Sequence, residues 1–216
     1  MQSPLNDESR ELESIVSVAI VLLAAGEASR MGKGKAHKLL AEFDCVPLVR
    51  RAAMTALGAD AVTVVVVTGH RGAEIESALS GLALISVENH DYASGMASSL
   101  IAGFGAAGVN NPHGVLVMLA DMPWVTTADI NALIATFRSS LGQAVVRAVS
   151  NGKPGNPVIL PRSLADAVLR LVGDVGARHI VEMSGLPVIE VDIGEAAHMD
   201  VDTPEDVIDA GGILRA

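Results

Sequence analysis

The chain has little cysteine, few aromatic side chains and no long apolar run. Its 216 residues include one cysteine, one tryptophan, one tyrosine and three phenylalanines. The single cysteine, Cys45, excludes an internal disulfide and leaves no second thiol for a metal cluster, which indicates a reducing compartment. The longest apolar stretch, residues 15–26, falls well short of the ~20 residues that a membrane-spanning helix needs. We therefore expect no membrane association.

Positive charge is also scarce. The sequence has 15 Lys and Arg against 25 Asp and Glu, a formal net charge of −10, which argues against nucleic-acid binding because that needs a basic face. The acidic first residues lack the positive start and apolar segment of a secretory signal. We expect residues 1–14 to form a flexible leader, residues 15–216 to form one domain, and the protein to be cytoplasmic.

The chain alternates short β-branched runs with longer amphipathic runs. This alternation predicts an α/β fold with a mostly parallel sheet. The predicted strands are residues 17–23, 61–67, 83–87, 114–119, 143–149 and 187–193. The predicted helices are residues 47–57, 73–80, 94–107, 127–138, 163–172, 177–185 and 203–212. The Gly- and Pro-rich residues 150–162 are predicted to form a functional loop.

Residues 22–38, "LLAAGEASRMGKGKAHK", concentrate positive charge behind the first predicted strand. Ala24, Ala25 and Gly26 have almost no side chain, so a nucleotide could lie against bare backbone N–H groups there. Arg30 and the lysines could neutralise its phosphates. The alternative, a tight turn before a solvated basic run, stays open on composition alone. Neither G-x-G-x-x-G nor G-x-x-x-x-G-K-[ST] occurs.

Carboxylates occur at two places where a metal could bind. Asp121 comes directly after a predicted buried strand, at the edge where ligands of α/β sheets bind. It could hold Mg²⁺, or it could only cap the turn before Pro123. Asp200 and Asp202 alternate along an extended segment and therefore share one face.

The segment "LAAGEASRMG…K" resembles the signature of the nucleotidyltransferases with a Rossmann-like fold. The sequence is most similar to the molybdenum cofactor cytidylyltransferases and their guanylyl relatives, from about residue 18 to about residue 208. The resemblance implies a single three-layer domain of the nucleotide-diphospho-sugar transferase type. Five residues separate Gly32 from Lys38, more than is usual in the family. The spacing to Pro47 favours Lys38 as the phosphate lysine, with Lys35 as the alternative.

The resemblance also implies roles for individual residues. The implied nucleotide contacts are Leu23, Ala24, Ala25, Gly26, Arg30, Lys38, Gly95, Ser98, Ser99 and Asp121. Among these, Arg30, Lys38 and Asp121 are the catalytic candidates. The motifs "L-x-D-x-P-x-V" and "D-x-D-T-P-E-D" imply Mg²⁺ at Asp121 and Asp202, with Asp200 as the alternative to Asp202. The "R-G-N-P" and "G-D-x-G-A-R" motifs imply acceptor contacts from Lys153, Asn156 and Arg178.

The implied reaction is Mg²⁺-dependent transfer of CMP from CTP to molybdopterin with release of pyrophosphate. Three alternatives stay open: the use of GTP, another phosphorylated acceptor, and a non-catalytic insertion factor for a molybdoenzyme. A molybdoenzyme of the xanthine dehydrogenase type is an expected partner. The sequence reads "LAAG" rather than the "LAGG" of the guanylyl relatives, and the added methyl of Ala25 favours a pyrimidine.

Overall fold

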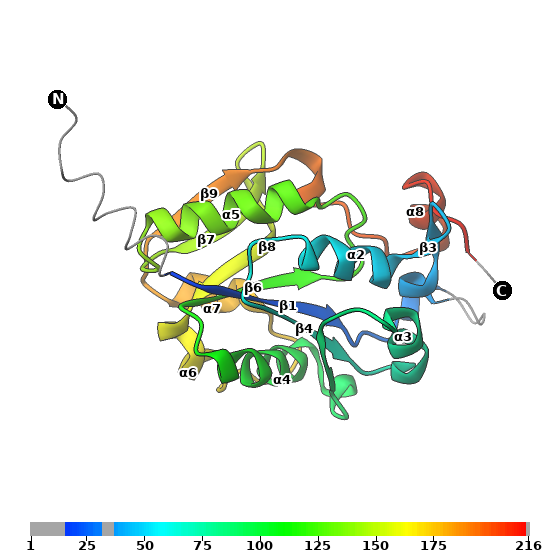
Figure 1. Ribbon diagram of the computed structural model, residues 1–216, viewed down its shortest axis with the longest axis horizontal. Coiled ribbons are helices and arrows are strands. Elements are labelled where there is room, and N and C mark those ends of the chain that lie inside the picture. Colours follow the sequence, from blue (N-terminus) through cyan, green and yellow to red (C-terminus); the bar gives the residue numbers. More distant parts are fainter. Residues whose placement is uncertain (1–15, 32–36, 215–216) are drawn as a thin grey trace.

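A seven-stranded sheet with helices on both faces forms the body of the molecule (Figure 1). The computed structural model describes residues 16–31 and 37–214, so the predicted leader lies outside the described residues. The strands are β1 Val18–Ala24, β2 Glu42–Phe43, β3 Val46–Pro47, β4 Thr63–Thr68, β5 Ile85–Glu88, β6 Gly114–Leu119, β7 Val145–Ser150, β8 Lys153–Pro161 and β9 Val188–Asp192. The α-helices are α2 Leu48–Leu57, α3 Gly72–Leu79, α4 Met96–Ala107, α5 Thr127–Ser139, α6 Ala165–Val168, α7 Ala177–Met183 and α8 Pro204–Asp209.

The order of the strands confirms the predicted, mostly parallel sheet. They lie in the order β5-β4-β1-β6-β8-β7-β9. Strand β1 pairs in parallel with β4 and β6, β4 with β5, and β7 with β9. Only β8 runs against its neighbours β6 and β7. Strands β2 and β3 form a separate hairpin.

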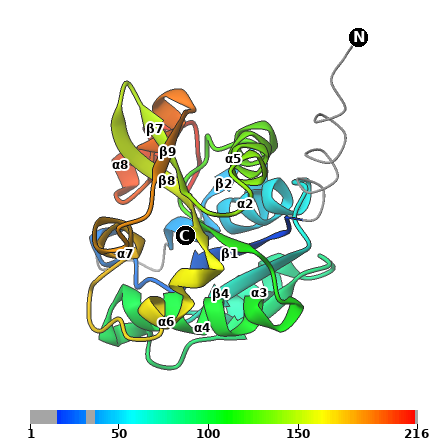
Figure 2. The same ribbon diagram turned by 90° about the vertical axis from the view of Figure 1, so that its left-hand side faces the viewer.

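Two apolar cores cover the two faces of the sheet. Successive residues of a strand point to opposite faces. Ile20 and Leu22 of β1 accordingly belong to the core formed with α2, α3 and α5. Ala19 and Val21 belong to the core formed with α4, α6 and α7. Figures 1 and 2 show α2 and α5 on one side of the sheet and α4 and α6 on the other. Strands buried on both faces explain the continuous apolar runs of the sequence.

The prediction of a loop over residues 150–162 is wrong. Only Asn151 and Gly152 form a turn there, and both have positive φ, 50° and 73°. Asn-Gly is the residue pair that favours a tight hairpin turn of this kind. Residues 153–161 form β8, whose apolar "VIL" segment is buried between β6 and β7. Pro157 lies where the ladder of β8 with β7 is irregular, opposite the stretch between Arg147 and Val149.

Two helix predictions also need correction. The predicted helix 163–172 is a 3-10 turn, Arg162–Leu164, followed by the four-residue α6. The predicted helix 94–107 begins later than expected, because Ser94 lies in a 3-10 turn, η3 Tyr92–Ser94, and Gly95 is the N-cap of α4. In the last helix, Thr203 caps α8 in a capping box with Asp206. No helix of the described residues is long and apolar enough to span a membrane.

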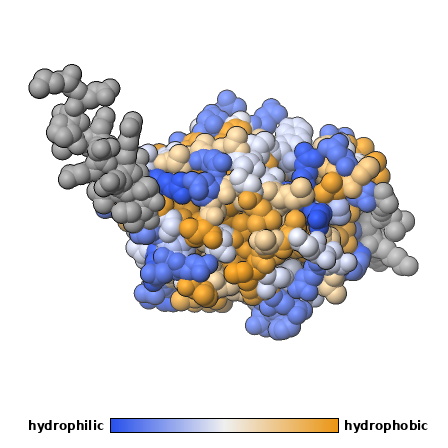
Figure 3. All heavy atoms as spheres, in the orientation of Figure 1, coloured by the Kyte–Doolittle hydropathy of each residue, from blue (hydrophilic) through white to orange (hydrophobic). Residues whose placement is uncertain are grey.

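The surface of the molecule carries an apolar groove of about 380 Å³ at the amino ends of β4 and β5. Val62 and Ile85, which line it, are 52% and 41% exposed. Figure 3 shows apolar surface in the centre of the visible face, where Figure 1 draws β1 and β4. No charged side chain lines this groove. Thr63 is the one lining residue with a polar side chain, so the charged groups of a nucleotide site must be sought at the other end of the strands.

A substitution in α4 tests the packing of this helix on the sheet. A Cβ added at Gly103 would lie 2.4 Å from Cγ1 of Val21, whereas one added at Gly105 would meet nothing within 4 Å. We expect Gly103→Ala to lower the free energy of unfolding by about 1–3 kcal/mol through overpacking. Gly105→Ala, the matched control, should raise it by about 0.5–1 kcal/mol. Urea denaturation measures both, and equal effects would contradict this packing.

Candidate active site

The main cavity lies at the carboxyl ends of β1 and β6 and has a volume of about 390 Å³. It is lined by Leu23, Ala24, Ala25, Gly26, Ala28, Lys38, Leu39, Tyr92, Gly95, Met96, Ser99, Leu119, Asp121, Asp174, Asp200 and Asp202. A volume of this size is typical of small-molecule sites. A Cβ built on Gly26 would meet nothing within 4 Å. Packing within the chain therefore does not require the glycine, and the bare backbone is accessible to a ligand.

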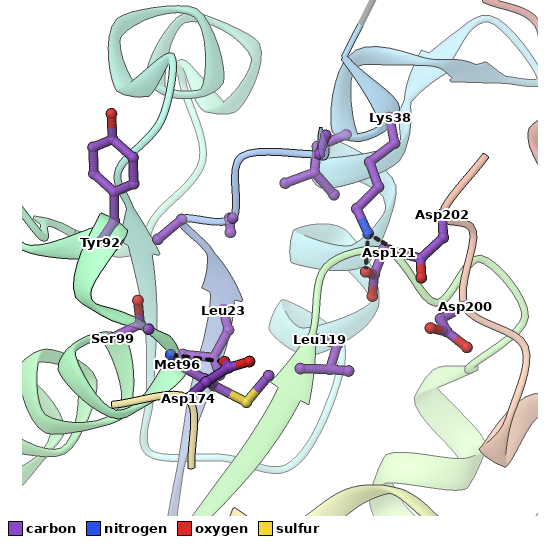
Figure 4. A pocket seen from close by; sticks show the side chains of 16 residues that line it. Leu23, Lys38, Tyr92, Met96, Ser99, Leu119, Asp121, Asp174, Asp200 and Asp202 are labelled. Atoms are coloured by element: carbon purple, nitrogen blue, oxygen red, sulfur yellow. Dashed lines mark hydrogen bonds and ion pairs between the residues drawn. The ribbon is translucent and has the colours of Figure 1, made fainter. Parts of the chain in front are cut away.

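A cluster of charged side chains lies at one end of this cavity (Figure 4). The Nζ atom of Lys38 lies 2.6 Å from a carboxylate oxygen of Asp121 and 2.6 Å from one of Asp202. Arg30 donates to the other carboxylate oxygen of Asp202. Arg30 itself is exposed and is not among the residues that line the cavity.

Backbone contacts hold the cluster together. Asp121 lies two residues beyond the end of β6, and its carbonyl oxygen accepts the N–H of Val201 at 3.0 Å. Val201 packs with Leu48 and Phe43 in a third apolar core, which connects the β2–β3 hairpin with α8. The segment that carries Asp202 is therefore fixed beside the end of β6.

Burial and ion pairing determine the charge states of the cluster. Burial raises the pKa of the Asp121 carboxyl, and Lys38 offsets only part of that effect. Burial tends to lower the pKa of Lys38, but Asp121 and Asp202 outweigh it, so the ammonium group stays charged with a raised pKa. For Asp202, burial is opposed and outweighed by Lys38 and Arg30, which lower the pKa of its carboxyl.

The three carboxylates of the cluster fit a divalent cation. Asp121, Asp200 and Asp202 each offer an oxygen, and these oxygens lie within 4.8 Å of one another. The second oxygen of Asp121, Oδ1, is buried and has no hydrogen-bond partner among the described residues. Buried polar atoms without partners are rare, so this oxygen is suited to a ligand. Oxygen ligands of this kind are those that Mg²⁺ prefers.

The cluster is not a positive patch. Three carboxylates stand against the two cations Arg30 and Lys38, so these five described groups carry one net negative charge. The sequence suggested cations free to neutralise phosphates, but both pair with carboxylates. Lys35, the alternative phosphate lysine, lies outside the described residues.

The two predicted serine contacts differ in their surroundings. Ser99 lines the cavity and Ser98 does not. The Ser98 hydroxyl donates to the carbonyl oxygens of Gly95 and Asp91, at 2.9 and 3.0 Å. Gly95 has φ of 112°, and a Cβ there would lie 2.5 Å from the backbone of Gly173. Glycine is therefore required at this position.

Two of the three residues predicted to bind the acceptor substrate lie together. Asn156 and Arg178 line a second cavity of about 140 Å³, whereas Lys153 does not. The sequence did not single out Arg147, which also lines it and pairs with Glu190 at 2.6 Å. The segment before Arg178 extends back to the main cavity, since Asp174 lines that one.

Several cavity residues could not be found from local motifs. Leu39, Tyr92, Met96 and Leu119 contribute walls of the main cavity, and Asp174 accepts the backbone N–H of Met96 at 3.4 Å. Asp174, Leu119 and Met96 had a signal, because they belong to the "GDVGAR", "LADMPWV" and "SGMASSL" segments. The others carry no residue type that distinguishes them from core positions.

A buried histidine holds together two segments that line the cavity. His37 is 3% exposed and its ring stacks on His70, with centroids 5.6 Å apart. Its Nδ1 accepts the N–H of Leu39 at 3.3 Å and caps the 3-10 turn η2, Lys38–Leu40. The backbone N–H of His70 donates to the carbonyl of Ala25 at 3.1 Å. The pair therefore connects the turn after β1 with the segment that carries Lys38.

Comparison with known proteins identifies the family. A family model described as "MobA-like NTP transferase domain" matches residues 20–188, which is most of the chain. The chain belongs to this family. Both the resemblance seen in the sequence and the expected class of enzyme, a nucleotidyltransferase, are confirmed.

Individual relatives support the assignment to the MobA-like family. The chain is 34% identical over 191 residues to the "Nicotine blue oxidoreductase" of Paenarthrobacter nicotinovorans, covering 86% of this chain and 92% of that protein. A nucleotidyl transferase from Methanothermobacter has a TM-score of 0.75 at 24% identity, with 90% and 95% of the two chains covered. The molybdopterin-guanine dinucleotide biosynthesis protein A of Archaeoglobus fulgidus has a TM-score of 0.64 at 16% identity, with 89% and 96% covered. These two structures share the fold.

The buried histidine makes stability depend on pH. Burial, Arg71 and His70 lower the pKa of His37 from 6.5 to about 4. Between these values the unfolded chain binds a proton that the folded chain does not, so stability should fall as the pH falls from 6.5 to 4. The maximum slope is about 1.4 kcal/mol per pH unit.

The test compares the wild type with His37→Asn, which keeps an acceptor for Leu39 but cannot be protonated. Urea unfolding is measured at several values between pH 7 and pH 4.5. The free energy of unfolding of the wild type should exceed that of the variant by a smaller amount as the pH falls. A difference that does not change with pH would show that His37 is not buried in its neutral form.

Proposed function

We propose that this MobA-like enzyme transfers CMP from CTP to the terminal phosphate of molybdopterin, with release of pyrophosphate and with Mg²⁺ as cofactor. The cluster of Lys38 with Asp121, Asp200 and Asp202, beside the bare backbone at Gly26, is the observation that carries this proposal. Together these groups suit a metal-bound triphosphate. The exposed, single Cys45 accords with a reducing, cytoplasmic location.

The charge balance of the cluster supports a metal-dependent reaction. One net negative charge among its five groups repels a triphosphate, and a divalent cation reverses that sign. Asp121 and Asp202 would hold Mg²⁺, with Asp200 as a further oxygen ligand. When bound, the ion neutralises charge on the phosphates during displacement at the α-phosphorus. Lys38 and Arg30 would then bind the leaving pyrophosphate.

The acceptor needs no general base. A phosphomonoester has a second pKa of ~6 and carries nearly two negative charges at neutral pH. Its oxygen attacks the α-phosphorus, the bond to the β-phosphate oxygen breaks, and pyrophosphate leaves. The protein then contributes mainly alignment and electrostatic stabilisation. This agrees with a cavity in which no histidine is a lining residue.

The choice of CTP and molybdopterin has weaker support than the reaction class. The methyl group of Ala25 in the cavity wall favours the smaller base, by an amount of only ~1–3 kcal/mol. The name of the Archaeoglobus neighbour, a molybdopterin-guanine dinucleotide biosynthesis protein, supports a molybdopterin acceptor. GTP is the competing nucleotide, and another phosphorylated compound is the competing acceptor, because the fold alone does not determine the substrate.

A second candidate comes from the relative at 34% identity, whose name describes an oxidoreductase. An oxidoreductase would turn over without pyrophosphate release and would not need Asp121 or Asp202. The carboxylate cluster of Asp121, Asp200 and Asp202 favours nucleotidyl transfer.

One experiment separates these functions. Purified protein is incubated with Mg²⁺, molybdopterin and each of the four nucleoside triphosphates, and pyrophosphate is measured. We expect release with CTP above that with GTP. Equal or greater release with GTP would contradict the cytidylyl assignment. Release only with another phosphorylated acceptor would exclude molybdopterin, and no release with any acceptor would favour the oxidoreductase or insertion-factor function.

Replacement of one carboxylate tests the metal site. Asp121→Asn keeps the shape of the side chain but removes its charge, so turnover should fall by on the order of 100- to 1000-fold. The control Asp209→Asn removes an exposed carboxylate at the end of α8 and should leave turnover unchanged. Near-normal pyrophosphate release from folded Asp121→Asn would remove this residue from the site.

Replacements in the second cavity test its role in acceptor binding. Asn156→Ala and Arg178→Ala should each raise the KM for molybdopterin by roughly tenfold while the affinity for CTP stays constant. Arg170→Ala, which removes an exposed arginine outside this cavity, is the control. A loss of CTP affinity instead would place the second cavity on the nucleotide side of the reaction.

A further inference from the structure

A buried asparagine lies behind the first turn of α4. Asn89 is 6% exposed and follows β5 directly. Its backbone N–H donates to the carbonyl oxygen of Thr68 at 2.8 Å, which fixes it to the end of β4. Its side chain is held as well, because Oδ1 accepts the backbone N–H of Asp91 at 3.0 Å.

This last contact determines which way the amide group of Asn89 faces. A backbone N–H can only donate, so the atom opposite the N–H of Asp91 must be the oxygen of the amide. The NH₂ group therefore points the other way. It donates to the Oγ atoms of Ser98 and Ser99, at 2.9 and 3.0 Å.

The two serines use their hydroxyl groups differently. The hydroxyl hydrogen of Ser98 is engaged by the carbonyl oxygens of Asp91 and Gly95. The oxygen of Ser99 accepts from Asn89, and its own hydrogen has no acceptor among the residues that the structure describes. Ser99 lines the main cavity and is 6% exposed. It therefore presents a hydrogen-bond donor to the cavity.

The position of Ser99 indicates which part of a nucleotide it meets. Figure 4 shows Ser99 on the side of the cavity opposite Lys38, Asp121 and Asp202. The end with Lys38 and the carboxylate cluster suits metal-bound phosphates, so the end with Ser99 is left for the base. Tyr92, Met96 and Leu23 line the cavity near Ser99 and offer apolar surface to a planar ring. Asp174 also lies at this end, where its carboxylate accepts the backbone N–H of Met96.

We propose that Asn89 is a positioning residue that fixes the Ser99 hydroxyl as a donor toward a hydrogen-bond acceptor on the base. Cytosine presents two acceptors, N3 and O2, and one donor on its pairing edge, whereas guanine presents one acceptor, O6, and two donors there. The polarity set by Asn89 thus favours a pyrimidine with acceptors at these positions. This inference rests on the proposed use of a nucleoside triphosphate and goes beyond it by assigning the residue that reads the base.

The test measures binding rather than turnover. Calorimetric titrations in Mg²⁺ compare CTP with the triphosphates of 3-deazacytidine and 2-thiocytidine, which lack or weaken the acceptors at positions 3 and 2. The wild type should bind one of these analogues roughly 3- to 10-fold more weakly than CTP, because the loss of one neutral hydrogen bond lowers affinity by about this factor. Ser99→Ala should bind that analogue and CTP equally.

The variant Asn89→Asp tests the positioning role directly. It preserves the shape of the side chain, but a carboxylate cannot donate, so the Ser99 hydroxyl must donate to it and presents only lone pairs to the cavity. We expect this variant to lose discrimination as completely as Ser99→Ala, although its hydroxyl is intact. Thermal unfolding and circular dichroism establish that the variants are folded. If Asn89→Asp does not fold, Ser99→Ala still decides whether Ser99 is the donor.

Three results would overturn the inference. They are a wild type that binds all three nucleotides equally, a Ser99→Ala variant that keeps the discrimination, and a loss of discrimination in Ser98→Ala instead. A folded Asn89→Asp that discriminates like the wild type would also refute the role of Asn89. These titrations contain no molybdopterin or other acceptor substrate, so their outcome does not depend on whether the proposed transfer occurs. Discrimination without transfer to molybdopterin would leave the inference standing and contradict the proposed function.

Discussion

The contacts of Lys38 with Asp121 and Asp202 join three segments that are far apart in the sequence. They bring together the turn η2, the end of β6 and the segment before α8. A separate apolar core that includes Val201 and Leu48 supports the same junction. Because Lys38 is partly buried, its charge cannot be left unpaired without a cost of several kcal/mol. The geometry of the cavity therefore depends on these ion pairs.

This arrangement changes the role that we assign to the basic residues after β1. A run of cations in an acidic protein suggests a positive patch that attracts phosphates. Arg30 and Lys38 are instead outnumbered by three carboxylates. In the proposed function, the described site therefore favours an anion only after a divalent cation has joined it. The opposite end of the cavity, near Ser99, Tyr92 and Asp174, lies apart from this cluster and suits a base.

Much of the fold could be predicted from the sequence, because strands buried on both faces leave long apolar runs and the helices between them are amphipathic. Asp121 was predicted at the end of β6 for the same reason. The strand β8 was missed because its glycine and prolines are typical of loops, while its pairing with β6 is decided by contacts distant in the sequence. The different orientations of Ser98 and Ser99 depend on Asn89, nine and ten residues away, and no local pattern reveals that network.

In the proposed function, the site binds a triphosphate only together with a divalent cation. Calorimetric titration of the wild-type protein with CTP, first in excess chelator and then in millimolar Mg²⁺ at constant ionic strength, measures this dependence. We expect no measurable binding in chelator and clear saturation with Mg²⁺. Equal affinity under both conditions would show that Arg30 and Lys38 bind the phosphates without metal, and would refute the proposed role of the cation.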